Sequence, residues 1–157
     1  MSSVLDEEQE FTDTAYSLLS AQREHLSTRM KNLALAASTG TGQDDLEREA
    51  HADNLRSQLR SVEAAKDRLY FGRINSDIQE THRIGRIGLR TESGDMALID
   101  WRAPNAAPFY QATTAHRMNT VLRRRISIKS VDGKQVVTHV DDEVLTEPGE
   151  GSYQAAK

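Results

Sequence analysis

Two adjacent carboxylates, Asp44 and Asp45, are the residues of this chain whose types and spacing suit metal chemistry. They follow residues 38–43, a segment with two glycines and three hydroxyls that predicts a turn between two helices. Carboxylates at the end of a helical arm could reach a Mg²⁺ ion in a partner's active site, because hard cations prefer oxygen ligands. The favoured interpretation is an ordinary helix start, where Asp caps free N–H groups and suits the helix dipole.

A run of basic residues is the second candidate: Arg123, Arg124, Arg125 and Lys129. Such a basic strip could bind phosphates or an acidic protein surface. Successive residues of a strand point to opposite faces, so we expect Arg124 on the face opposite Arg123 and Arg125. The alternative interpretation is a solvated strand face with no partner.

The third candidate is Trp101, the only tryptophan of the chain. Together with Phe109 and Tyr110 it forms a cluster in a chain that is only 5% aromatic. Its ring could stack on a base or anchor an interface. Buried aromatic side chains are more common than exposed stacking platforms, so we expect Trp101 to be buried at a corner of a sheet.

No other motif supports catalysis or metal binding. The chain lacks the phosphate-binding pattern GxxxxGK[ST], and Gly85 and Gly88 lie in a strand-like segment rather than opening a helix. The five histidines form no metal-ligand pair, and no serine has the context of a nucleophile elbow. We therefore predict no catalytic residue and no metal site in this chain.

The charge balance changes along the chain. Residues 1–69 contain eight basic and 13 acidic residues, residues 70–129 contain ten and five, and residues 130–157 contain two and six. A basic middle between acidic ends suggests distinct surfaces for distinct neighbours. There is no cysteine, which excludes disulfides and favours a reducing, cytoplasmic setting. No apolar run approaches the ~20 residues that a membrane span needs, and the N-terminus lacks the features of a signal peptide.

An α+β fold must position these candidates. Residues 6–37 predict one long helix and residues 44–69 a second, because apolar and small residues recur at alternating steps of three and four. The short turn between them predicts an antiparallel helical hairpin, a coiled-coil arm. The expected seam comprises Phe11, Ala15, Leu18, Leu19, Gln22, Leu26, Met30, Leu33 and Ala37 in the first helix, and Ala52, Leu55, Leu59, Val62, Lys66 and Leu69 in the second.

From Tyr70 onward the apolar residues alternate, which is typical of strands. Residues 83–90 predict one strand, whose glycines suggest a bulge or a close backbone approach. A turn at 92–95 leads into a second strand at 96–101, and the two form a β-hairpin.

A second hairpin is predicted further on. Residues 121–129 and 135–140 read as its strands, Asp132-Gly133 is a type I′ turn signal, and residues 141–143 end it. We therefore divide the chain into a helical arm (1–69), a small antiparallel β module (70–145) and a linker or frayed end (146–157).

Several segments of the chain carry a family resemblance. They are Tyr70-Phe71-Gly72-Arg73-Ile74, the stretch from Ile84 to Leu89 with Gly85 and Gly88, and Asp100-Trp101-Arg102-Ala103-Pro104 with Phe109-Tyr110. They resemble the N-terminal region of the HelD family, bacterial superfamily 1 helicase-like ATPases that bind RNA polymerase. The helical hairpin and the segment Asp141–Leu145 are also similar to that family.

The resemblance implies a function. Family members insert an N-terminal coiled-coil arm into the secondary channel of RNA polymerase, and the full-length ATPase releases nucleic acid and recycles stalled polymerase. ATP and Mg²⁺ would then act in the full-length protein, downstream of this region, and this piece would carry no cofactor. Partner contacts would fall on the hairpin tip, where we expect a wedge or anchor rather than a catalytic finger: Thr39, Gly40, Thr41, Gly42, Gln43, Asp44 and Asp45.

Two other functions stay open at this point. The basic β region with Trp101 could form a nucleic-acid-binding module, whose affinity would fall steeply with salt. Alternatively, the helices could form a homodimeric coiled-coil spacer. Lys66 and Gln22 on the seam favour marginal, specific pairing over a strong zipper, and we expect a monomer.

Overall fold

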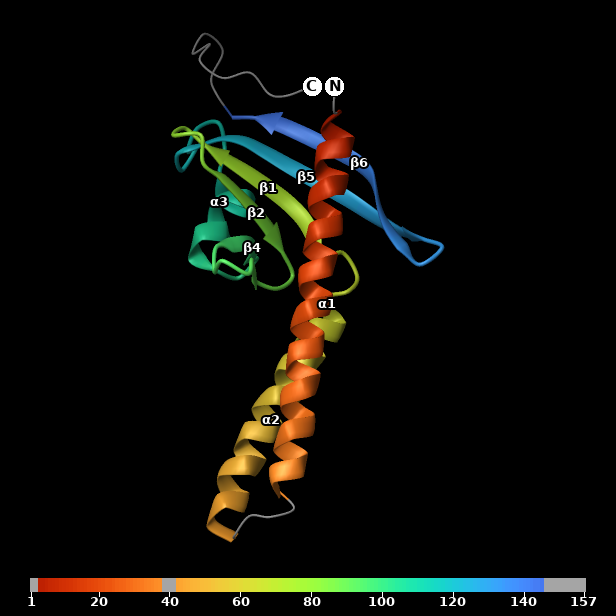
Figure 1. Ribbon diagram of the computed structural model, residues 1–157. Coiled ribbons are helices and arrows are strands. Elements are labelled where there is room, and N and C mark those ends of the chain that lie inside the picture. The colour runs from red at the N-terminus through yellow and green to blue at the C-terminus, as the bar shows by residue number, and fades with distance from the viewer. Residues whose placement is uncertain (1–2, 38–41, 146–157) are drawn as a thin grey trace.

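Two long helices and a six-stranded sheet form an α+β fold, as the sequence predicts (Figure 1). The computed structural model describes the backbone of residues 3–37 and 42–145 and the side chains of residues 3–36 and 46–145. The elements are α1 Val4–Ala37, α2 Gly42–Ala64, β1 Tyr70–Ser76, β2 Thr81–Gly85, β3 Leu89–Arg90, β4 Met96–Asp100, the 3-10 helix η1 Pro104–Ala106, α3 Ala107–Gln111, β5 Thr120–Val131 and β6 Lys134–Val144.

Helix α1 begins at Val4 because Ser3 and Asp6 cap it. The backbone N–H of Asp6 donates to Oγ of Ser3 at 3.0 Å, and the N–H of Ser3 donates to the Asp6 carboxylate at 3.3 Å. This reciprocal pair satisfies two of the N–H groups near the start of the helix. No glycine or proline interrupts the 34 residues that follow, which confirms the long helix predicted over 6–37.

Helix α2 ends at Ala64, so the prediction of a helix to Leu69 is wrong at this end. The hydroxyl of Tyr16 donates to the carbonyl of Lys66 at 2.7 Å and accepts from the N–H of Leu69 at 3.3 Å. Arg68 has a φ of 54°, outside the helical region. A tertiary contact from α1 therefore replaces the helical hydrogen bonds that local periodicity predicts.

The two helices lie side by side as a hairpin that projects beyond the sheet (Figure 1). Their seam buries Ala15, Leu19, Leu26, Leu55 and Val62, each at most 3% exposed. Partly buried Met30 and Leu33 extend the seam toward the far end of the hairpin, and Leu59 fills it between Leu55 and Val62. The apolar stripe of each helix is therefore covered within a single chain.

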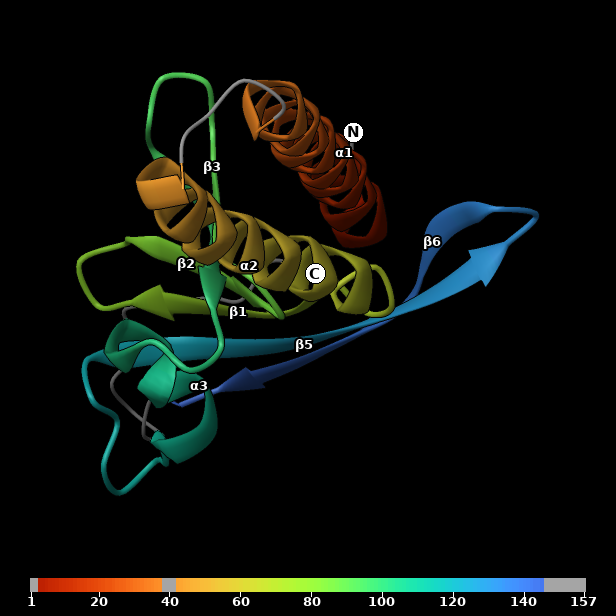
Figure 2. The same ribbon diagram turned by 90° about the horizontal axis from the view of Figure 1, so that it is seen from below.

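The sheet has the strand order β3-β4-β2-β1-β5-β6. All neighbouring strands are antiparallel except β2 and β4, which are parallel. Viewed along the arm, α1 and α3 lie on opposite sides of β1 and β5 (Figure 2). The sheet therefore has one face for the arm and one face for the short helix.

The single strand predicted over 83–90 is wrong, because the chain breaks it into β2 and β3. After Gly85 the chain leaves the sheet, and the N–H of Arg86 donates to the carbonyl of Leu69 at 3.0 Å. A Cβ at Gly85 would lie only 2.1 Å from that carbonyl oxygen, so the close backbone approach predicted for these glycines occurs here. The predicted hairpin survives in the short pairing of β3 with β4.

The β5–β6 hairpin confirms the second prediction. Asp132 and Gly133 both have positive φ, 51° and 79°, as a type I′ turn requires. However, β6 continues to Val144 instead of ending at residues 141–143. These acidic residues pair in register with the three arginines of β5, so opposite charges extend the ladder.

Two apolar clusters cover the two faces of the sheet. On the arm face, Leu69, Tyr70, Leu98, Ile126 and Val137 continue the seam of the helices. On the other face, Phe109 of α3 packs with the buried residues Ile74, Ile84, Ile99 and Ala106. Within the described parts of the chain, no helix has the length and apolar character needed to cross a bilayer.

Candidate functional site: the helical arm and its anchor

The far end of the arm carries exposed apolar side chains. Leu35 on α1 is 73% exposed and Leu46 on α2 is 76% exposed. A groove of about 470 Å³ opens between the two helices, lined by Met30, Leu33 and Ala52 among others. The predicted tip residues Thr39, Gly40 and Thr41 lie outside the described residues, as do the side chains from Gly42 to Asp45. The favoured interpretation of Asp44 and Asp45 as an ordinary helix start, rather than as metal ligands, thus stays a prediction.

The near end of α1 is fastened to the sheet by one buried carboxylate, Glu8. Its side chain is completely buried and accepts hydrogen bonds from Tyr70 at 2.6 Å and from Arg124 at 2.5 Å. Arg73 donates to the same carboxylate at 3.1 Å, and Arg83 lies 3.8 Å away. We call Glu8, Tyr70, Arg73, Arg83 and Arg124 the anchor.

Electrostatics keep this buried carboxylate charged. Burial alone would raise the pKa of Glu8, but the hydrogen bonds from Tyr70 and Arg124 and the nearby charges of Arg83 and Arg73 hold it below its ordinary value. Burial and the charge of Glu8 raise the pKa of Tyr70, so its hydroxyl stays protonated and donates. An ionised acceptor with ionised donors forms the stronger class of hydrogen bond.

Arg124 links the arm to the last strand as well. Its guanidinium donates two hydrogen bonds to Asp142 of β6, at 2.6 and 3.0 Å. The Arg124 side chain is only 1% exposed, so both of its carboxylate partners compensate a charge that is removed from water. Helix α1, β5 and β6 are therefore held at one point.

Two further contacts fix the direction of α1. Gln9 donates to the carbonyl of Gln135 at 3.0 Å and accepts from the N–H of Val137 at 2.8 Å. These bonds fall beside the irregular step of the β5–β6 ladder. Phe11 packs edge-on against Tyr70, with ring centroids 4.7 Å apart, and Arg83 lies over its ring at 4.3 Å. The helix is therefore held at several points along its first turns.

The predicted basic strip does not form one open surface. As expected from alternation, Arg123 and Arg124 face opposite sides of the sheet, but both are buried. Arg123 donates to Glu143 at 2.8 Å and to the carbonyls of Phe109 and Ala112, so it holds α3 against the sheet. Arg125 and Lys129 stay exposed. A sequence pattern shows the charge of a strand but not the acids that pair with it.

The Asp100–Pro104 segment forms a tight turn that exposes Trp101. Asp100 accepts from the backbone N–H of Arg102 and from its guanidinium, all at 2.9–3.0 Å, and these bonds hold the pKa of Asp100 below its ordinary range. Ala103 bonds back to the Asp100 carbonyl, and Pro104 then starts η1. Trp101 is 47% exposed, so the prediction of a buried corner tryptophan is wrong.

The glycines of the resembling segments have different roles. A Cβ at Gly72 would lie 2.5 Å from the Phe109 ring, so only a glycine at this position lets α3 pack this closely on the sheet. Gly85 admits the Leu69 carbonyl in the same way. Gly88 has no contact closer than 3.6 Å, which is ordinary packing distance. Tyr110 of α3 is exposed beside Trp101, with ring centroids 6.3 Å apart.

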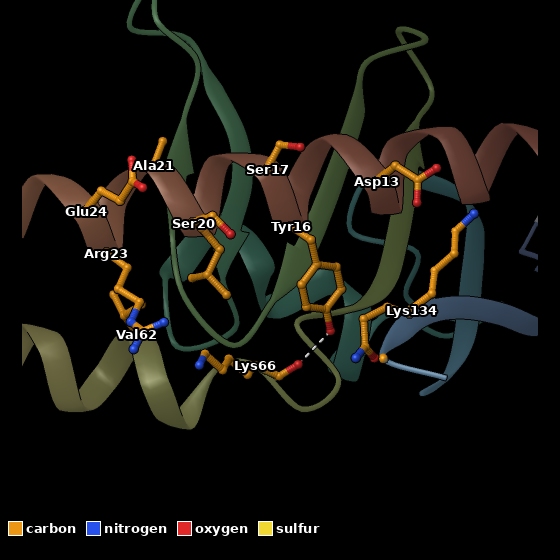
Figure 3. A pocket seen from close by; sticks show the side chains of 13 residues that line it. Asp13, Tyr16, Ser17, Ser20, Ala21, Arg23, Glu24, Val62, Lys66 and Lys134 are labelled. Atoms are coloured by element: carbon orange, nitrogen blue, oxygen red, sulfur yellow. Dashed lines mark hydrogen bonds between the residues drawn. The ribbon is translucent and has the colours of Figure 1, made fainter. Parts of the chain in front are cut away.

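A cleft of about 910 Å³ lies where α1, the end of α2 and the β5–β6 turn meet. Figure 3 shows Tyr16 reaching from α1 to the carbonyl of Lys66, with Asp13 and Lys134 farther along the cleft. Arg23 pairs with Glu63 at 2.8 Å. The charged side chains of this cleft are exposed, so it lacks the buried acid–base group that catalysis commonly uses.

The sequence did not reveal the anchor as a site, and two of its five residues were missed. Sequence reasoning singled out Tyr70, Arg73 and Arg124 for other reasons, but not Glu8 or Arg83. One signal was present: Glu8 lies three residues before Phe11 and seven before Ala15, so a charged residue occupies the apolar seam. An ionisable group on a core-facing stripe requires a buried partner.

Gly133-Lys134 has the glycine–lysine order of a phosphate loop but does not form one. The Gly133-Lys134 pair lies in a turn between two strands, whereas a phosphate loop joins a strand to a helix. Among the side chains described, no group of three His, Asp or Glu residues could hold a metal ion.

Comparison with known proteins agrees with this architecture. The family model described as DNA helicase IV HelD, N-terminal domain, matches residues 5–156. No curated protein matches the chain. The matched range includes the arm, the anchor and the whole described sheet. The chain therefore belongs to the family of HelD N-terminal domains.

Proposed function

We propose that this domain binds RNA polymerase and that its α1–α2 hairpin enters the secondary channel of that enzyme. One observation carries the proposal: α1 is a single uninterrupted helix, anchored to the sheet over its first turns and projecting with α2 beyond it. Helix α2, which pairs with α1 in the projecting hairpin, has 23 residues and is about 35 Å long, and this sets the length that could enter a channel. Membership of the HelD family supports the same partner.

The surface of the arm supports this function. Residues 1–69 contain 13 acidic and eight basic residues, which suits a channel that admits nucleotides and is lined with basic groups. The exposed Leu35 and Leu46, with the groove between the helices, offer apolar contacts at the far end. Charge would direct the arm to its partner, and apolar burial would hold it there.

In the full-length protein the arm would act together with an ATPase core. ATP and Mg²⁺ would bind that core, and their hydrolysis would supply the energy to release nucleic acid from stalled polymerase. The residues of this chain would contribute docking only. A fixed angle between arm and sheet would transmit movement of the core to the polymerase.

A homodimeric coiled-coil spacer is not favoured. The residues that would form such a dimer, among them Leu26 and Leu55, are 1% exposed within one chain. No long apolar stripe is left on the described part of the arm to pair with a second copy. Sedimentation at micromolar concentration should give a monomer.

The proposal is tested by size-exclusion chromatography of this chain with core RNA polymerase, at low and at physiological salt. We expect co-migration at both, weakened when Leu35 and Leu46 are replaced by serine. Ile78→Ser is the matched control, because Ile78 is 71% exposed but lies in the β1–β2 turn, away from the arm. Absence of co-migration for the unmodified chain, or equal weakening by Ile78→Ser, would overturn the proposal.

A further inference from the structure

A second surface lies where the end of α2, the sheet and α3 meet. Two hollows of about 450 and 640 Å³ adjoin there, since Phe71 and Arg86 line both. The first is bounded by the end of α2 and Trp101, and the second by α3 and β5. We call this continuous surface the arginine–aromatic groove and define it by Arg68, Phe71, Arg86, Trp101, Tyr110 and Arg125.

The charge of this groove is strongly one-sided. Arg68, Arg86 and Arg125 line it, and no Asp or Glu is among the described residues that do so. Arg68 and Arg86 form no ion pair with a described carboxylate, whereas Arg125 lies 3.7 Å from Glu143, which is also bound to Arg123. A fourth arginine, Arg102, is neutralised by Asp100. The free guanidinium groups therefore favour an anionic ligand.

The rings of the groove are held in place before any ligand arrives. Trp101 is fixed by its backbone bond to Gly85 at 2.9 Å and by the Asp100–Arg102 turn, yet half of its surface is open. Tyr110 is 50% exposed and meets Trp101 edge-on at an interplanar angle of 76°. A rigid exposed ring loses little conformational freedom when a planar group stacks on it.

We propose that the arginine–aromatic groove binds single-stranded nucleic acid. The phosphates of the nucleic acid would contact the guanidinium groups, and its bases would stack on the exposed rings. The bases of a duplex already stack on one another, so their faces are not available for stacking on the protein rings. An acidic protein segment would use the arginines but not the three rings. A folded protein partner would need a mostly apolar centre, whereas three of the six residues that define this groove are arginines.

The single tryptophan makes this groove directly measurable. Titrating the 157-residue chain with an oligothymidylate of about 12 nucleotides should quench Trp101 fluorescence to saturation. The logarithm of the affinity should fall with the logarithm of salt concentration with a slope of about −2, as expected for roughly three phosphate contacts. An oligouridylate of equal length distinguishes RNA from DNA as the preferred strand, and either result supports the proposal.

Variants separate the groove from the rest of the surface. In anisotropy titrations with labelled oligothymidylate, Arg86→Gln and Trp101→Ala should each weaken binding about tenfold, and Trp101→Phe should restore most of the loss. Lys31→Gln on the exposed face of α1 is the control and should bind as the unmodified chain does. These residues are exposed, so the folded state should tolerate each change.

Three results would overturn the proposal. Binding without quenching of Trp101 would place the nucleic acid elsewhere. Equal quenching and affinity with a duplex of the same length would exclude stacking. A labelled polyglutamate peptide that binds as tightly as the oligonucleotide, with the same loss in Arg86→Gln, would identify an acidic protein segment as the ligand.

Discussion

The carboxylate of Glu8 and the guanidinium of Arg124 lie 2.5 Å apart across 116 positions of sequence, both fully shielded from water. This contact joins the first turns of the arm to β5, the strand between β1 and β6. Because Arg124 also binds Asp142, the same guanidinium fixes three elements. The direction of the arm is thus set by charge and hydrogen bonding, which specify an angle more narrowly than apolar packing does.

Removing this carboxylate should destabilise the domain. Glu8→Gln leaves the buried arginine partly uncompensated, and breaking a buried pair costs about 3–5 kcal/mol of unfolding free energy. Urea denaturation monitored by circular dichroism measures the loss. Glu7→Gln is the control, because Glu7 also contacts Arg73 but is exposed, and it should cost about 1 kcal/mol or less. Equal losses for the two variants would contradict a buried anchor.

The anchor should also give the domain an acid-sensitive stability. The pKa of Glu8 is below its ordinary value of 4.5 when folded. The contribution of Glu8 to the unfolding free energy is therefore complete above pH 4.5 and is lost as the pH falls through the lower pKa of the folded state. The unfolding free energy, measured between neutral pH and about pH 3, should fall more steeply in the unmodified chain than in Glu8→Gln. Parallel curves for the two proteins would argue against this assignment.

Two glycines in one segment should differ sharply in their tolerance of alanine. Gly85→Ala would place a Cβ 2.1 Å from the Leu69 carbonyl, so backbone must move, at a cost of about 1–3 kcal/mol or more. Gly88→Ala meets nothing closer than 3.6 Å and should change the unfolding free energy little. Thermal unfolding of both variants compares them. A tolerated Gly85→Ala would mean that Leu69 does not approach β2 as described.

Two of the three aromatic residues of the 101–110 region, Phe109 and Trp101, should likewise differ in their tolerance of alanine. Phe109 is 6% exposed and closes the second apolar cluster, so Phe109→Ala should cost about 3–5 kcal/mol. Trp101 is 47% exposed, and Trp101→Ala should cost about 1 kcal/mol or less. Acrylamide should quench Trp101 readily in the folded chain. Strong protection of Trp101 from acrylamide would show that its turn is covered, which would contradict the exposure described above.

Short sequence patterns predicted the helices and the turn, which depend on interactions between residues close in sequence. The three-and-four spacing gave the two helices, and Asp132-Gly133 gave the β5–β6 turn because only residues tolerating positive φ fit it. The end of α2 could not be found this way, since Tyr16, many residues earlier, replaces its helical hydrogen bonds. Local patterns could not predict the parallel pairing of β2 with β4 either, since β3 lies between these strands in the sequence.

The candidate functional residues were also predictable only in part, because their partners lie far away in the sequence. Arg123, Arg124 and Arg125 stood out as a charged run, but their roles depend on acids far away in the chain. Trp101 was noticed for its rarity, yet its exposure follows from the Asp100–Arg102 hydrogen bonds, which sequence spacing does not reveal. Resemblance to the HelD family was the one sequence signal that reached beyond local structure, and the family match confirms it.

The central claim is that the arm is the polymerase-binding element, and one variant tests it most directly. Replacing residues 29–52 with a short glycine-serine turn shortens the arm but keeps the anchor and the Leu26–Leu55 end of the seam. Circular dichroism and urea denaturation first establish that the sheet and anchor are intact. Size-exclusion chromatography with core RNA polymerase at physiological salt then compares it with the unmodified chain. We predict that the unmodified chain co-migrates and the shortened chain does not; co-migration of both would contradict the claim and assign binding to the β module.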